Sequence, residues 1–251
     1  MKKHFAATLL ILSSTTALAA KNEEMFQLAA SGGIASPSVT TSVFQNPAGL
    51  AYTSRLNVDA YGGWDSSFNN PTYRGGLAYG NGNFGLTGGV NILPSASASL
   101  AYFGLGFYLA GIHTAFGASG TLGLSPASGT SINVGAMIFP SDKFHLGFTA
   151  LGINNSIQEL GAGIGIALNS NFEFVFDASA NSSLGNLNLK PGILITDRNV
   201  GVTASYGIGN GSTQLINGFN AGAFISLNNQ IKWEVYYNQI TTIFTAFSIR
   251  I

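Results

Sequence analysis

From Leu56 to its last residue, the chain alternates between apolar and polar residues. In one stretch, for example, Glu173 lies between Phe172 and Phe174. Strict alternation predicts β-strands whose two faces meet different surroundings. The same pattern recurs in stretches that begin at Leu56, Tyr73, Phe84, Ile132, Phe144, Val200, Ile231 and Ile243.

The connections between these stretches alternate in length. Short polar turns are predicted at 80–83, 140–143, 169–171, 197–199 and 228–230, with a further tight turn at Gly104-Leu105-Gly106. Longer links are predicted at 65–72, 92–96, 116–131, 153–158, 181–186 and 210–217. Short turns at one end and longer loops at the other are typical of outer-membrane barrels, and the spacing predicts about fourteen strands.

Composition decides which surroundings the two faces meet. Charged residues make up only 8% of the chain, against about 25% in an ordinary soluble domain. The mean hydropathy is +0.29, yet no apolar run after residue 20 reaches the roughly 18 residues of a membrane helix. Residues 55–251 are therefore predicted to form an all-β, antiparallel, up-and-down barrel in the outer membrane of a Gram-negative bacterium, with apolar side chains facing lipid.

The net charge and the position of the last predicted strand indicate which partners to expect. The net charge of 0 argues against nucleic acid as a partner. The last predicted strand ends at Ile251, which suits a barrel that is handed to an assembly machinery. We therefore expect outer-membrane lipid and barrel-assembly machinery as partners.

The first 54 residues lack this alternation. Residues 1–20 are predicted to be a signal peptide, with Lys2 and Lys3 before an apolar stretch and Ala17-Leu18-Ala19 at the cleavage site. A membrane anchor is the alternative, but the apolar part is too short to span a bilayer. Residues 21–54 are predicted to fill the barrel as a plug. A periplasmic tail is the alternative, and it would leave the apolar residues of this segment in water.

One motif stands out within the predicted plug: Asn46, Pro47, Ala48, Gly49 and Leu50. Its proline fixes the backbone and its glycine permits unusual dihedral angles, so the motif predicts a compact turn. By itself the motif is a turn. Its position between a signal peptide and a barrel predicts that it anchors the plug.

Charged residues fall on the polar face of the strands. They are Asp59, Arg74, Glu173, Asp177, Lys190, Lys232, Glu234 and Arg250. Both signs occur, so a structural network in the lumen is favoured over a permeation path, because buried charges must be paired. Asp59 and Arg74, with Asn46, are expected to satisfy the plug's backbone groups. The inward glycines Gly163 and Gly165, together with Gly161, leave room for a second backbone.

Little in the sequence indicates chemistry. The chain has no cysteine, and no spacing of His, Asp and Glu suggests a metal. Outside the signal peptide the histidines are His113 and His145, and both are expected to be isolated rather than part of a catalytic triad. We therefore expect no enzyme activity, no cofactor and no metal.

These residues resemble the long-chain fatty-acid transporter family of the outer membrane (FadL/TodX-like). That family carries an Asn-Pro-Ala-Gly segment within a hatch, followed by a fourteen-stranded barrel, and Asn46 to Gly49 match the segment. The resemblance implies passage of small hydrophobic, fatty-acid-like molecules. It does not extend to the family's long outer loops, which form a landing groove for substrate. A second group with the same segment serves in secretion, so a non-transporting scaffold is the alternative function.

A hydrophobic molecule in such a barrel would leave sideways, where strand pairing is weakest. The predicted place is the end of the third strand, at Gly88, Gly89 and Pro94, because glycine and proline weaken a strand ladder.

Overall fold

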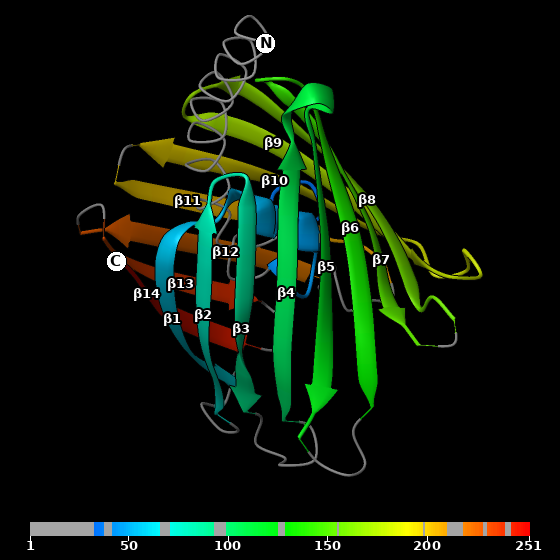
Figure 1. Ribbon diagram of the computed structural model, residues 1–251. Coiled ribbons are helices and arrows are strands. Elements are labelled where there is room, and N and C mark those ends of the chain that lie inside the picture. The colour runs from blue at the N-terminus through cyan, green and yellow to red at the C-terminus, as the bar shows by residue number, and fades with distance from the viewer. Residues whose placement is uncertain are drawn as a thin grey trace, which may run out of the picture.

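Fourteen antiparallel strands form a closed barrel in the computed structural model of the chain (Figure 1). The structure describes residues 33–37, 42–65, 71–92, 99–124, 129–154, 156–197, 199–209, 218–227, 230–238 and 242–251. Each strand pairs with its neighbours in sequence, and β1 closes the barrel on β14. The prediction of an all-β, up-and-down barrel is confirmed.

The strands are β1 (Ser54–Asp65), β2 (Thr72–Asn81), β3 (Phe84–Ile92), β4 (Leu100–Leu109), β5 (Thr114–Gly123), β6 (Thr130–Ser141), β7 (Phe144–Ile153), β8 (Glu159–Asn169), β9 (Phe172–Asn181), β10 (Asn188–Asp197), β11 (Val200–Gly207), β12 (Gly218–Ser226), β13 (Ile231–Asn238) and β14 (Thr242–Arg250). The described residues also form the short 3-10 helices η1 (Pro47–Tyr52) and η3 (Ala110–Ile112). No helix among the described residues is long and apolar enough to cross a membrane.

The two faces of the sheet differ as the alternation predicts. Phe174 and Phe176 on the outer face are each 44% exposed, whereas Asp177 on the inner face is 1% exposed. Exposed aromatic residues lie near both ends of the barrel: Tyr79, Phe84, Phe107, Trp233 and Phe247 near one end, and Tyr73, Phe103, Tyr206, Phe219 and Tyr237 near the other. An apolar outer surface with aromatic residues at both rims is the surface that a barrel presents to a bilayer.

The connections follow the predicted rule except at 104–106 and at 239–241, where a link of only three residues joins β13 to β14 at the loop end. The turns at 82–83 and 142–143 are short, and the links at 66–71 and 208–217 at the other end are longer. The predicted turn at Gly104-Leu105-Gly106 is wrong, since β4 runs straight through these residues and the chain turns at η3 instead. The predicted link at 116–131 is correspondingly shorter, because β5 extends to Gly123.

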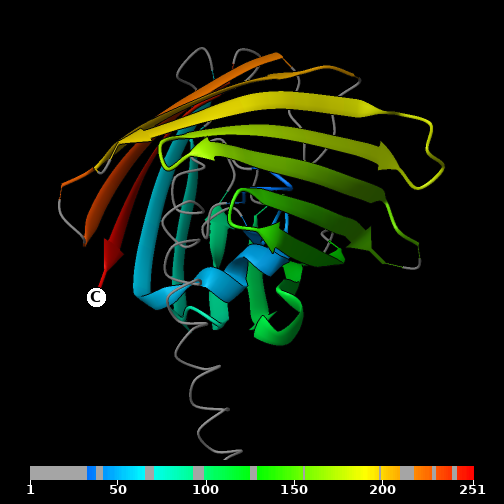
Figure 2. The same cartoon turned by 90° about the horizontal axis from the view of Figure 1, so that it is seen from above.

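The helix η1 lies inside the barrel (Figure 2), and all six of its residues are buried. It packs against the inner faces of β2 to β6. We call the described residues 33–37 and 42–53 the luminal segment. The predicted signal peptide and residues 21–32 of the predicted plug lie outside the described residues, so both stay predictions.

Candidate functional site

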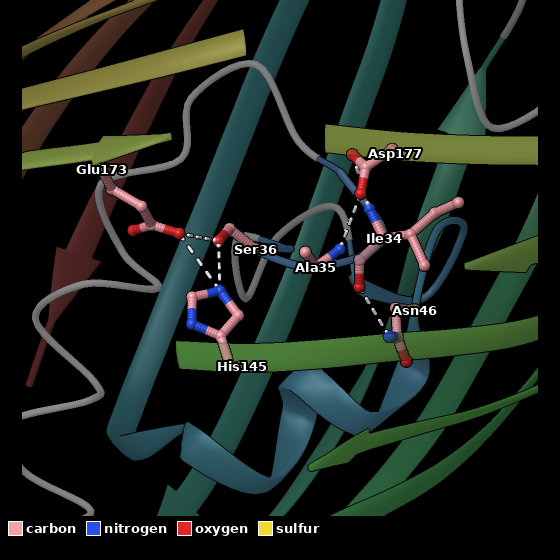
Figure 3. A network of polar contacts seen from close by, with 7 residues as sticks. All are labelled: Ile34, Ala35, Ser36, Asn46, His145, Glu173 and Asp177. Atoms are coloured by element: carbon pink, nitrogen blue, oxygen red, sulfur yellow. Dashed lines mark hydrogen bonds and ion pairs between the residues drawn. The ribbon is translucent and has the colours of Figure 1, made fainter. Parts of the chain in front are cut away.

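Asn46 contacts three parts of the site. Its Nδ2 donates to the carbonyl oxygen of Ile34 at 2.7 Å (Figure 3). It also donates, more weakly, to the carbonyl oxygen of Ala136 in the wall at 3.4 Å. Its Oδ1 accepts from the amide of Ala48 at 3.2 Å, which caps the start of η1. Asparagine is a favoured residue at this position, and Pro47 at the first helical position needs no hydrogen-bond acceptor for its nitrogen. The motif is therefore a helix cap that also holds the rest of the luminal segment.

The inner wall beneath the luminal segment is a row of glycines, which we call the glycine track. It consists of Gly80, Gly85, Gly106, Gly117, Gly135, Gly147 and Gly163, on strands β2 to β8. Several are direct cross-strand partners: Gly85 pairs with Gly106, and Gly117 pairs with both Gly106 and Gly135. The track follows the luminal segment across seven strands.

Each position of the track is occupied closely by the luminal segment or its anchors. A β-carbon on Gly85 would overlap the carbonyl oxygen of Leu50, and one on Gly147 would overlap that of Ile34. At Gly163 a β-carbon would lie 2.7 Å from the amide nitrogen of Ala35. Only glycine permits this approach. The prediction that inward glycines admit a second backbone holds at Gly163, whereas Gly165 faces the side chains of His145 and Glu173.

Polar side chains of the wall bind the backbone of the luminal segment. The carbonyl oxygen of Val43 accepts from Ser119 Oγ at 2.5 Å and from Asn133 Nδ2 at 3.1 Å. Asn133 Oδ1 in turn accepts from the amide of Gly152 at 3.0 Å. These contacts satisfy backbone groups that are cut off from water, as a buried irregular segment requires.

Asp177 on β9 binds the other end of the luminal segment. Its two carboxylate oxygens accept from the amides of Ile34, at 3.1 Å, and Ala35, at 3.0 Å. Lys190 lies directly across from Asp177 on β10 and is also buried. A carboxylate that accepts two backbone hydrogen bonds beside a cation is well compensated for its burial.

Ser36, His145 and Glu173 form a second anchor (Figure 3). Ser36 Oγ donates to Glu173 Oε1 at 2.6 Å and lies 3.0 Å from His145 Nε2. The same Nε2 lies 3.1 Å from Glu173 Oε1. A catalytic triad needs the serine on one ring nitrogen and the carboxylate on the other, so this cluster fastens Ser36 rather than activating it. The expectation that His145 is isolated is wrong.

The predicted inward charges separate into two groups. Glu173, Asp177 and Lys190 bind or adjoin the luminal segment, as described above. Asp59 lies on the other side of the lumen, where it hydrogen-bonds Ser248 and adjoins the ion pair of Lys232 and Glu234. At the end of the barrel, Arg250 Nε donates to Asn57 Oδ1 at 3.4 Å.

Arg74 reaches the luminal segment in an unexpected way. Its guanidinium carbon lies 4.4 Å from the centre of the Phe44 ring and 5.3 Å from that of Tyr61. Arg74 and Asp59 were expected to satisfy the segment's backbone groups. In the described residues, Ser119, Asn133 and Asp177 form hydrogen bonds to the backbone of the segment instead.

The end of η1 is held by apolar contacts. The ring of Tyr52 packs against Tyr108 at 5.8 Å and against Phe139 at 5.4 Å between centres. Met137 and Ala115 complete this buried cluster. Burial raises the pKa of the Tyr52 hydroxyl well above its ordinary value, so this side chain is neutral at physiological pH.

The ladder is continuous at two of the three residues of the predicted lateral opening. Gly88 pairs with Leu77 and Phe103, and Gly89 pairs with Gly76 and Tyr102. Pro94 lies outside the described residues. A lateral opening at this place stays a prediction.

The closed barrel, its apolar outer surface and its polar inner wall define a β-barrel of the bacterial outer membrane. Known structures of such barrels share the fold. The toluene transporter TodX of Pseudomonas putida is 8% identical, with a TM-score of 0.54 over 84% of this chain and 92% of TodX. The toluene transporter TbuX of Ralstonia pickettii is 10% identical, with a TM-score of 0.53 over 83% of this chain and 93% of TbuX.

The monoaromatic hydrocarbon channel CymD is 12% identical, with a TM-score of 0.50 over 83% of this chain and 91% of CymD. At these identities the likeness shows a common fold. No family model and no curated protein matches the chain.

Proposed function

We propose that the protein lets small hydrophobic molecules cross the outer membrane, and that the luminal segment controls this passage as a plug. One observation carries the proposal: a segment bearing Asn46 to Leu50 is fitted to the inner wall along seven strands. Such a fit requires glycine, which has no side chain, at every position of the glycine track. An empty barrel would not require a row of glycines along its inner wall.

The polar contacts support a segment that can be released as a unit. Its main polar anchors are hydrogen bonds donated by the wall side chains Ser119 and Asn133 and accepted by Asp177. Each such bond contributes about 0.5–1.5 kcal/mol, and more where a charge takes part. We propose that the chain belongs to the FadL/TodX-like transporters, which the shared Asn-Pro-Ala-Gly segment and the fold of the two toluene transporters support.

A scaffold without transport is the second candidate, and the connections favour it. The links at the end opposite the turns, such as 66–71 and 124–129, are too short to build a large outer loop. A hydrophobic molecule would therefore have no binding groove on outer loops before it enters the barrel. In this second function the luminal segment is a permanent filling of the lumen.

Uptake separates the two candidates. Radiolabelled oleate and toluene are offered to cells with the protein in the outer membrane and to cells with the empty vector. Faster uptake of either compound with the protein supports transport. Equal uptake by the two kinds of cell supports the scaffold, provided that the protein is present in the outer membrane and its heat-modifiable gel mobility shows that it is a folded barrel.

A further inference from the structure

Two inward side chains, Arg74 and Tyr102, contact the ring of Phe44, and we call these two side chains together with Tyr61 the cage. Arg74 faces the ring at 4.4 Å, and Tyr102 meets it edge-on at 5.2 Å between centres with an interplanar angle of 66°. The guanidinium carbon of Arg74 also lies 5.3 Å from the centre of the Tyr61 ring, so Tyr61 contacts Arg74. A cation above the face of a ring and a second ring at its edge are both favourable arrangements for any aromatic guest.

The contacts of Phe44 differ from those of the residues around it. Val43 and Asn46 are fully buried, and hydrogen bonds to the wall hold both of them. Phe44 is only partly buried, and its ring is held by ring contacts with Arg74 and Tyr102. A free aromatic molecule of similar size can make the same contacts without any covalent link to the chain.

The cage faces one end of the lumen. Arg74 and Tyr102 lie near the first residues of β2 and β4, and Tyr61 lies near the last residues of β1. All three are therefore close to the end that carries the longer connections. The helix η1 packs nearer the opposite end, against Gly80 and Gly85. A molecule that enters from the loop end meets Phe44 before it meets Asn46 to Leu50.

We propose that Arg74 and Tyr102 form a binding site for a small aromatic molecule, with Tyr61 against the guanidinium, and that Phe44 occupies this site when no such molecule is present. The site takes a single six-membered ring, and the guanidinium selects a ring with a π face over a saturated ring. This inference rests on the proposed function, since it names the class of molecule that reaches the luminal segment. It assigns Phe44 as an internal competitor of that molecule.

Binding to the purified barrel tests the inference directly. The probe is 4-fluorobenzyl alcohol, followed by fluorine NMR, and (4-fluorocyclohexyl)methanol is the saturated match. Phe44→Ala removes the competitor, so the Kd of the aromatic probe should fall roughly tenfold. Arg74→Gln in that background should raise it again by a similar factor and leave the Kd of the saturated probe unchanged.

Phe224→Ala is the matched control, because Phe224 is also an inward ring beneath a cation, Lys232 at 4.8 Å. It should leave both Kd values unchanged. Heat-modifiable gel mobility checks that each variant is a folded barrel. An unchanged Kd in Phe44→Ala, or an equal effect of Arg74→Gln on both probes, overturns the inference.

The result is separable from that of the uptake experiment. Aromatic binding that depends on Phe44 and Arg74, without uptake, supports the site and removes the transport proposal. Uptake without such binding overturns the site and leaves transport in place.

Discussion

Gly117 on β5 lies directly against the carbonyl group of Pro47, so closely that a β-carbon on Gly117 would overlap it. The two residues are far apart in the sequence, and this contact is one of seven along the glycine track. The shape of the inner wall is thus complementary to the backbone of the luminal segment.

Gly117→Ala should displace η1 from the wall. Overpacking of this kind costs about 1–3 kcal/mol, so the luminal segment should become sensitive to protease while the barrel stays folded. Limited proteolysis followed by mass spectrometry measures this. Gly75→Ala is the control, because a β-carbon on Gly75 meets nothing within 4 Å. Equal protection of the two variants would contradict the close fit.

Asp177→Asn should loosen the other end of the luminal segment. The carboxylate serves two amides, whereas an amide side chain offers one oxygen and turns a donor toward the second N–H. Leaving a buried N–H without an acceptor costs about 1–3 kcal/mol. Hydrogen exchange at Ile34 and Ala35 should accelerate accordingly. Asp142→Asn, in an exposed turn, should have no effect, and unchanged exchange in Asp177→Asn would show that the clamp contributes little.

Phe176→Arg should impair assembly more than Val175→Arg. Phe176 is 44% exposed on the lipid face, and arginine costs about 2–4 kcal/mol there when it lies near the middle of the bilayer. Val175 points inward and lines a small cavity beside Asp177 and Lys190. The fraction of protein that gains heat-modifiable gel mobility measures assembly. A smaller defect for Phe176→Arg than for Val175→Arg would reverse the assignment of faces on β9.

Ser36 should not react as a nucleophile. Its hydroxyl and Glu173 Oε1 meet the same nitrogen of His145, whereas a catalytic triad needs the carboxylate on the opposite ring nitrogen. A fluorophosphonate probe should leave the folded protein unlabelled. Labelling that disappears in Ser36→Ala would contradict this prediction and indicate a nucleophilic serine.

The barrel could be predicted from the sequence because its signal is local. Alternation around Phe174 or Trp233 already determines which side chains face lipid, and short polar turns determine the pairing of neighbouring strands. The inward charges followed from the same parity, and the structure places Glu173 and Asp177 on the inner face.

The contacts of the luminal segment could not be predicted in this way, because they join residues that are distant in sequence. Glycine is ambiguous by itself: Gly104 and Gly106 suit a tight turn, but they serve a close approach to Leu50 and Ala51. The meeting of Ser36 with His145 and Glu173 depends on how the segment lies in the closed barrel. The sequence does contain one sign of these contacts, since glycines recur at inward positions of β2 to β8.

Conductance in planar bilayers tests most directly whether the luminal segment closes the barrel. The wild-type protein is compared with a variant that lacks residues 21–50, after both are shown to be heat-modifiable barrels. Removal of the segment should turn a barrel with little conductance into an open pore for small ions, because the lumen of a barrel of this size is wide when empty. Equal conductance of the two proteins would contradict the proposal that the segment is the plug.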